Sequence, residues 1–347
     1  MAIKTETGVI NSKALAKQVV SWGKKGIDVS NCRDAEEMLA KSGLDWHVAL
    51  QEIRTADGTP TPWKQSVKID PDGTQTPLSI VPVKNWEPLS NHTFLNRAIG
   101  VAESFGGSVS RVGWLKKDTA AVNQQSFLWA TISPGELAIE LGLDKYEGIT
   151  PNILLSSGTS YGCGYSCKML LVRNCCQNGM VDRQSTSLKS THQTNVAFEN
   201  FTFEQVRDSI NLYKIERDLL LNTQIAADRV YTMFIHTFGH EAKLNQPIDR
   251  QPRKVQLLWD IYNGEADRTF EDVGIDLGQA RIRGTYYGVL QAVVAYNNHF
   301  GESSGDNKMM EIMNAERGKE IDKIRASLTA AAAKRVKETV SVGVRAW

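Results

Sequence analysis

The chain has 347 residues, of which 41% are hydrophobic, 23% charged and 8% aromatic. This composition is typical of a globular protein and excludes a disordered or fibrous chain. The 40 Lys and Arg residues balance 39 Asp and Glu residues, and the formal net charge of +1 excludes a global field that draws the protein to nucleic acid or to a membrane. A surface that binds anions must therefore be a local patch.

The sequence favours a cytoplasmic location without membrane contact. Residues 1–13 contain no apolar run after the first lysine, and the apolar run at 288–296 is far shorter than the ~20 residues of a membrane span. The cysteines are odd in number, which favours reduced thiols over a disulfide framework: Cys32, Cys163, Cys167, Cys175 and Cys176.

The first half of the chain predicts a short helical segment followed by strands. Residues 1–45 are expected to hold an amphipathic helix at 12–24 and a second helix that begins at Asp34. One further helix is expected at 90–105, with Gly106 and Gly107 as its stop. Strand-like runs occupy residues 47–54, 64–70, 108–114, 124–132, 151–155, 165–173 and 187–194. Turns separate most of these runs, so we expect an antiparallel or mixed sheet.

From residue 201 the pattern is helical. One apolar face runs from 203 to 239, and helices are expected at 255–262, 285–300 and 308–340. The last helix carries a narrow apolar stripe: Ile321, Ile324, Leu328, Ala332 and Val336. Such a stripe suits a partner helix or a seam between copies, although packing on the chain's own domain is favoured.

These patterns predict an α+β fold with an antiparallel or mixed β-sheet core, flanking helices and a helical C-terminal part. The expected division is an N-terminal helical segment at 1–45, a β-rich core at 46–200 and a helical part at 201–347 that packs on the core and ends in a long helix.

One motif is compatible with a serine hydrolase. Residues 158–162 match the G-x-S-x-G elbow, with Ser160 as its nucleophile. An elbow needs a helix directly after it, whereas 163–172 reads as a strand, and no acid and histidine pair follows at the expected positions. A hairpin turn is the better interpretation.

Metal and nucleotide sites are not predicted. Cys163, Cys167, Cys175 and Cys176, with His192 nearby, lack the usual spacing of a zinc knuckle, so buried thiols are favoured. His236 and His240 lie one helical turn apart without the glutamate of a metalloprotease motif, which favours a helix end near Gly239. Neither a P-loop nor a dinucleotide-binding motif is present. We therefore predict no catalytic residues, no metal and no cofactor.

Basic and aromatic residues alternate along the strands, as in sequence-tolerant single-strand binders. The candidate interface comprises Arg111, Trp114, Lys116, Lys117, Trp129, Lys168 and Arg173, with Phe127, Arg183 and Lys189 in the same runs. The alternative is a sheet with one solvated face and one core face, which also produces alternation of this kind.

Three short runs resemble a known family. They are Leu171 to Met180 (LVRNCCQNGM), Ser190 to Thr194 (STHQT) and Arg281 to His299, which begins Arg-Ile-Arg-Gly-Thr. Together they resemble the signatures of the phage/plasmid-like family, a domain of unknown function of prophages and conjugative elements, over about residues 75 to 300. Matching positions are Cys176, Gln177, Asn178 and His192. The chain departs from the signatures at Gly179 and Gln193, and no arginine directly precedes His192.

The resemblance implies a mobile element in a bacterial host, and hence the host cytoplasm, but no reaction. Asn178 and His192 have two interpretations: a structural turn built on Asn178 and Gly179, or contacts with a ligand. At the level of layout, the chain is also similar to phage single-strand annealing proteins of the Rad52-like type.

We therefore expect an ATP-independent, oligomeric protein that binds and anneals single-stranded DNA in phage or plasmid recombination. Phosphates are assigned to Arg111, Lys116, Lys117, Lys168 and Arg173, and bases to Trp114 and Trp129. The alternative is a non-enzymatic accessory factor that binds a host protein, of the anti-defence or anti-restriction type, with the long C-terminal helix as its contact element.

Overall fold

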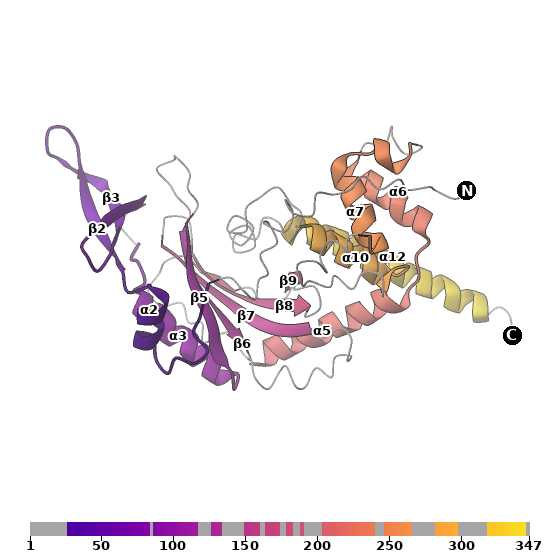
Figure 1. The fold of residues 1–347 in the computed structure, drawn as a ribbon, viewed down its shortest axis with the longest axis horizontal. Helices are drawn as coiled ribbons and strands as arrows, with labels where there is room; N and C mark the ends of the chain where they lie inside the picture. Colours follow the sequence, from indigo (N-terminus) through magenta and orange to yellow (C-terminus); the bar gives the residue numbers. More distant parts are fainter. Residues whose placement is uncertain are drawn as a thin grey trace.

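The computed structural model describes residues 26–83, 86–116, 126–133, 149–159, 164–173, 178–182, 188–190, 203–239, 246–265, 282–297 and 318–344. Figure 1 shows an elongated molecule with a small sheet at one end, a large sheet in the middle and a group of helices at the other end. Buried residues of the large sheet and of the helices belong to one hydrophobic cluster.

The large sheet is antiparallel throughout the strands described. Its order is β1-β5-β6-β7-β8-β10, and β9 pairs with β8 beside β10. The strands are β1 (Ile27–Asp28), β5 (Ser108–Lys116), β6 (Ser126–Ser133), β7 (Ile149–Gly158), β8 (Tyr165–Arg173), β9 (Asn178–Asp182) and β10 (Leu188–Ser190). The α+β fold with an antiparallel sheet is therefore confirmed.

A second, three-stranded sheet projects from the body, and we call it the arm (Figure 1). Its strands are β2 (His47–Arg54), β3 (Pro60–Ile69) and β4 (Gln75–Pro82). Both of its turns use a glycine in the left-handed region, since Gly58 and Gly73 each have φ of 85°. The two predicted strands are confirmed, whereas β4 was not predicted.

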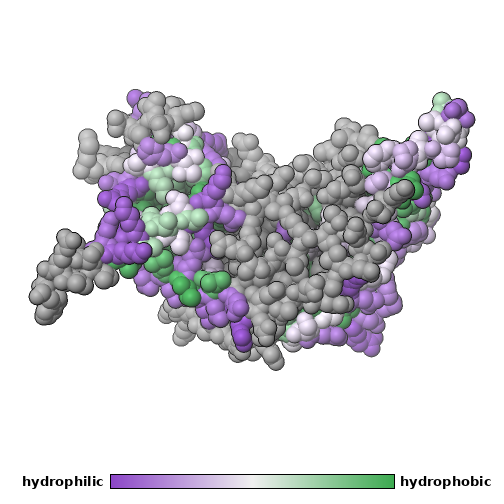
Figure 2. Space-filling view, turned by 180° about the vertical axis from the view of Figure 1, so that it is seen from behind, coloured by the Kyte–Doolittle hydropathy of each residue, from purple (hydrophilic) through white to green (hydrophobic). Residues whose placement is uncertain are grey.

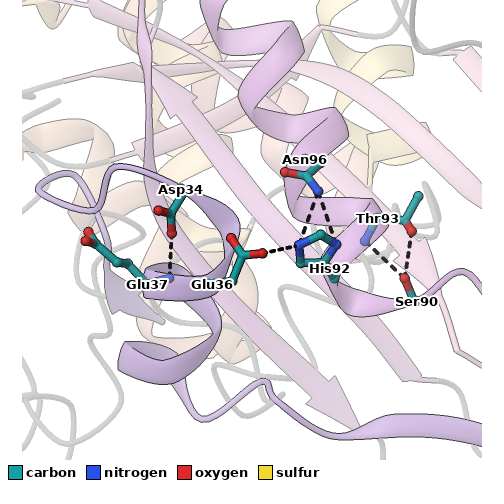
Figure 3. A network of polar contacts seen from close by, with 7 residues as sticks. All are labelled: Asp34, Glu36, Glu37, Ser90, His92, Thr93 and Asn96. Atoms are coloured by element: carbon teal, nitrogen blue, oxygen red, sulfur yellow. Dashed lines mark hydrogen bonds and ion pairs between the residues drawn. The ribbon is translucent and has the colours of Figure 1, made fainter.

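Two short helices cover one end of the large sheet. They are α2 (Ala35–Ser42) and α3 (Asn91–Ser104), and both are capped by side chains that precede them. Asp34 accepts a hydrogen bond from the backbone N–H of Glu37, and Ser90 accepts one from that of Thr93. Figure 3 shows these two caps together with the contact between Glu36 and His92, which ties α2 to α3.

The C-terminal part consists of packed helices, as predicted. They are α5 (Phe203–Asn222), α6 (Ala227–Phe238), the short 3-10 helix η4 (Ile248–Arg250), α7 (Arg253–Asn263), α10 (Tyr286–Ala295) and α12 (Gly318–Val344). Every residue of α10 is buried, so this helix forms the centre of the group.

The Arg-Gly-Thr run at 283–285 has a structural role at the start of α10. Gly284 has φ of 84°, and its N–H donates to the Tyr262 hydroxyl at 3.0 Å. Thr285 then caps α10, because its Oγ1 accepts from the N–H of Gly288 at 3.0 Å. A Cβ on Gly288 would lie 2.3 Å from the carbonyl oxygen of Ile282. The tight turn therefore requires glycine on both sides of the cap.

The same turn divides the apolar run at 203–239, which the sequence predicted as one continuous helical stretch. Ile225 donates its N–H to the carbonyl of Gly284 at 2.8 Å, and Tyr286 donates to the carbonyl of Thr223 at 3.2 Å. These bonds hold residues 223–226 in extended backbone, so α5 and α6 are separate helices. The single-helix prediction was wrong because this break is tertiary in origin.

The stripe of α12 packs on the chain's own domain for most of its length. Ile324, Leu328 and Ala332 are buried, while Val336 is 44% exposed. Glu216 of α5 fixes the contact, since it accepts from Arg325 and from Thr329 at 2.6 Å each.

The structure contradicts one further prediction, a turn, and does not describe the residues of another, a helix. The turn proposed at Asn178 and Gly179 is wrong, because both residues begin β9, in register with Arg173 and Val172. The helix at 12–24 lies outside the described residues. Within the described part of the chain, no helix combines the length and apolar character needed to cross a bilayer.

Burial raises the pKa of the Asp260 carboxyl in α7 to about 6, and the nearby Glu265 adds to this shift. The folded state thus binds this proton more tightly than the unfolded state does, and stability falls as pH rises from about 4 to about 6. Asp260→Asn removes the cost of the buried charge. We expect it to add about 1–2 kcal/mol to the free energy of unfolding at pH 7.5 and almost nothing at pH 4. Urea denaturation across this pH range measures the difference in unfolding free energy between Asp260→Asn and the wild type, which should increase with pH. Exposed Asp45→Asn is the control, and an equal gain at both pH values would contradict the assignment.

Candidate nucleic-acid interface

Two of the predicted cations lie in one row across the large sheet. Arg111 of β5 is in register with Thr131 of β6, which pairs with Leu154 of β7, which pairs with Lys168 of β8. Residues paired in this way project from the same face of a sheet. Trp129 lies two residues before Thr131, so it shares that face with Arg111 and Lys168. The geometry therefore unites three of the predicted residues.

Trp129 occupies a slot that two glycines create. A Cβ on Gly113 would lie 2.7 Å from the indole, and a Cβ on Gly26 would lie 2.5 Å from it. The Trp129 side chain is only 2% exposed. Its Nε1 is buried without a hydrogen-bond partner in the described residues. The indole thus packs closely on Gly26 and Gly113 and does not present a ring to solvent.

Arg111 contacts the edge strand of the same sheet. Its Nη2 donates to the carbonyl of Gly26 at 2.8 Å, and its Nη1 lies 3.8 Å from a carboxylate oxygen of Asp28. Hydrogen bonds from Ser30, together with the charge of Arg111, hold the pKa of Asp28 below its usual value. About a fifth of the Arg111 side chain is exposed, at 22%. It is the most accessible of the three residues on this face.

Lys168 is buried, with 2% exposure, and its face of the sheet carries both Leu154, its register partner on β7, and the hydroxyls of Ser156 and Ser166. Ser156 and Ser166 pair across β7 and β8, and their Oγ atoms lie 2.7 Å apart. Sheet faces that are permanently covered are usually filled by Val, Ile and Leu. A covered face that carries a lysine and a serine pair is therefore unusual.

Trp114 lies on the opposite face of the sheet. It is in register with Leu128, a member of the core cluster against which α2 and α3 pack. Its ring meets that of Trp46 at 5.3 Å, and the Lys68 ammonium lies 5.4 Å from the centroid of each ring. These contacts join the arm to the body. The two tryptophans predicted to stack on bases thus lie on different faces, and each has a packing role.

For two of the remaining predicted residues, the structure gives the strand register alone. Lys116 pairs with Ser126, and Arg173 pairs with Ile149 and Asn178. Lys117 and His192 lie outside the described residues.

The groups considered for catalysis do not gather into a site in the described part of the chain. Burial raises the pKa of the Cys167 thiol well above its usual value, as for a structural cysteine. His236 is exposed in the last turn of α6, which ends at Phe238 as the pattern predicted. Ser160, Cys163, Cys175, Cys176 and His240 lie outside the described residues. Among those described, no three His, Cys, Asp or Glu side chains are close enough to hold a metal ion.

The sequence pattern did not predict one exposed polar network between α2 and α3. Figure 3 shows Glu36 of α2 directed at His92 of α3, with Oε1 and Nε2 2.8 Å apart, and Asn96 beside the same ring. The hydrogen bond from His92 lowers the pKa of Glu36. The nearby Ser90 hydroxyl is engaged in capping α3. This network therefore links two helices, and no periodic pattern in the sequence could have indicated it.

The arm carries a second feature that was missed. Trp63 on β3 is 44% exposed, and β2 pairs with β3 alone among the described strands. The other outer strand, β4, contains Pro77 and Pro82, which cannot donate backbone hydrogen bonds. β2 has no proline and so leaves an edge that can pair with another chain.

Comparison with known proteins identifies one family. The sequence model described as Domain of unknown function (DUF932) matches residues 93–339. The match runs from α3 into α12, so it includes the large sheet from β5 onward and the helical part, while the arm lies outside it. No curated protein and no solved structure matched significantly. Since the match spans more than half of the sequence, the chain belongs to the DUF932 family.

Proposed function

We propose that this protein binds single-stranded DNA and anneals complementary strands in the recombination system of a phage or plasmid, without nucleotide hydrolysis and as an oligomer. The observation that supports the proposal most strongly is the row that crosses the large sheet from Arg111 through Thr131 and Leu154 to Lys168, here called the polar row for its two cationic ends. Two cations on one face, separated by two strands, suit a phosphate backbone that crosses the sheet.

The burial of this face limits how DNA can bind. Lys168 is buried, so single-stranded DNA contacts it only after the groups that cover this face of the sheet move away. Exposing Trp129 costs about 3–5 kcal/mol, the penalty typical of emptying a large aromatic slot, whereas stacking on one base returns about 1–3 kcal/mol. Trp129 therefore stays in its glycine slot, and the contacts with DNA are electrostatic, through Arg111 and Lys168.

Fluorescence anisotropy with a labelled single strand of about 40 nucleotides tests the proposal at several salt concentrations, with the duplex as comparison. We expect single-strand binding that weakens with salt. Arg111→Gln with Lys168→Met should weaken it about tenfold or more and lower the salt slope by about two. Arg253→Gln, on the exposed start of α7, is the matched control and should leave affinity unchanged. Absence of binding at micromolar protein, or equal losses in both variants, would overturn the proposal.

A protein partner is the second candidate, and the open edge of β2 favours it. An extended segment of another protein can add a strand there, with Trp63 as an aromatic anchor on the arm. Trp63→Lys should then abolish capture of a host protein while single-strand affinity stays unchanged. The reverse result, with lost DNA binding and retained capture, would exclude the arm as the protein-binding element.

A further inference from the structure

The helical part carries exposed apolar residues on two adjacent helices. Leu212 and Ile215 of α5 are 58% and 68% exposed, and Val336 of α12 is 44% exposed. Figure 2 shows apolar surface on this part of the molecule, near the end where α12 leaves the body. Single exposed apolar residues are common, but these three lie on helices that are already in contact through Glu216.

The side of α12 that packs on α5 continues beyond it. Arg325, Thr329, Ala332 and Val336 follow one another at intervals of four, three and four residues, so they share one side of the helix. The first two bond to Glu216 of α5, and Ala332 is fully buried. At Val336 the same side has become exposed. All five side chains from Lys334 to Glu338 are exposed, and α12 projects past the other helices in Figure 1.

A projecting helical end of this length is marginal in isolation. Residues 334–344 span about 16 Å at 1.5 Å per residue, which is shorter than helices that hold together alone in water. Val336 supplies an apolar contact, and the sequence repeats valine at 340 and 344. Packing against another helix would stabilise this end.

The charges favour pairing of the α12 end with α5 of another copy over pairing with a second α12 end. The exposed end from Lys334 to Glu338 contains three cations and one carboxylate. Glu338 pairs with Lys334 at 3.9 Å in an exposed pair, and the remaining net positive charge makes two such ends repel each other. The outward side of α5 carries Asp208 one turn before Leu212, and Asp218 one turn after Ile215, with Asp218 also bonded to Arg217. An end that is basic around a valine therefore complements an apolar stripe that begins one turn after the exposed carboxylate of Asp208.

We infer that the projecting end of α12 binds the Leu212 and Ile215 stripe on α5 of a second copy, and that the two copies exchange this contact reciprocally. This inference specifies the oligomeric part of the proposed function. It places the interface on the helical part, away from the polar row of the large sheet, so dimer formation and DNA binding can fail independently.

Light scattering coupled to size exclusion tests the inference on the full chain without DNA. We expect a dimer at tens of micromolar for the wild type. Val336→Asp and Ile215→Asp should each raise the dimer dissociation constant more than about tenfold, and thermal melts should show that both variants stay folded. Val83→Asp is the matched control, because Val83 is 45% exposed and lies at the end of the arm, where its N–H donates to the carbonyl of Pro62 on β3. It should leave the dimer intact.

A charge exchange identifies the pair directly. Asp208→Lys and Lys334→Glu should each weaken the dimer, and the double variant should recover most of the affinity. A monomeric wild type would overturn the inference. So would a dimer that Val336→Asp breaks and Ile215→Asp leaves intact, since that result indicates pairing between two α12 ends. DNA affinity measured on the same variants reports separately on the proposed function.

Discussion

Gly113→Ala is expected to lower the free energy of unfolding by about 2–3 kcal/mol, although it adds a single methyl group. The new Cβ would lie 2.7 Å from Cζ2 and 2.9 Å from Nε1 of Trp129. Gly26 also packs closely on this indole, since a Cβ there would lie 2.5 Å from Cη2 and 2.7 Å from Cζ2, so the ring has little room to move. β5 or the backbone at Gly26 would have to shift.

Gly100→Ala is the matched control for this effect. Gly100 lies in α3, is exposed and has no atom within 4 Å of its Cβ position, so alanine should stabilise the helix by about 0.5–1 kcal/mol. Urea denaturation followed by circular dichroism measures both variants. Adding Trp129→Leu to Gly113→Ala should remove most of the additional cost of the methyl group. Wild-type stability in Gly113→Ala would contradict the close contact between Gly113 and the Trp129 indole.

Local pattern predicted most of the fold because most of its elements are set locally. The strands at 47–54 and 165–173 were predicted with the bounds that the structure has, since alternation and turn residues define both. The start of α2 follows from Asp34, which caps it. By contrast, β4 contains two prolines, which weaken any strand pattern. The break between α5 and α6 depends on Gly284, far along the chain, so no window around 223–226 could reveal it.

The arrangement of the candidate residues could be predicted only within single strands, for a related reason. Alternation shows which residues of one strand share a face, but not which face of the sheet each strand presents. Arg111, Trp129 and Lys168 share a face only because of the register among β5, β6, β7 and β8. Trp114 is on the other side. The slot for Trp129 needs Gly26, which the sequence alone does not connect to β6. The sequence pattern therefore selected candidate residues but could not predict their burial.

Glu216→Ala is expected to destabilise the protein by about 2–3 kcal/mol, through the contact between α5 and α12. The Glu216 carboxylate accepts from Arg325 Nε and from Thr329 Oγ1, each at 2.6 Å. The side chains of Arg325 and Glu216 are only 8% and 18% exposed. Alanine would remove this acceptor from a guanidinium that stays buried, which costs far more than the loss of a solvated pair. The loss of unfolding free energy is measured by urea denaturation.

Asp218→Ala provides the contrast within the same helix. Asp218 pairs with Arg217 at 2.7 Å but is 53% exposed, so its removal should cost less than about 0.5 kcal/mol. Salt separates the two cases further, because about 0.5 M NaCl screens an exposed pair much more than a buried one. Replacing both Glu216 and Arg325 by Met should restore most of the stability that Glu216→Ala loses, since no buried charge then needs a partner. If the Glu216 and Asp218 variants lose equal stability, the buried pair does not hold α12 in place. The inferred dimer contact requires α12 to be held on α5, so this result would also argue against that contact.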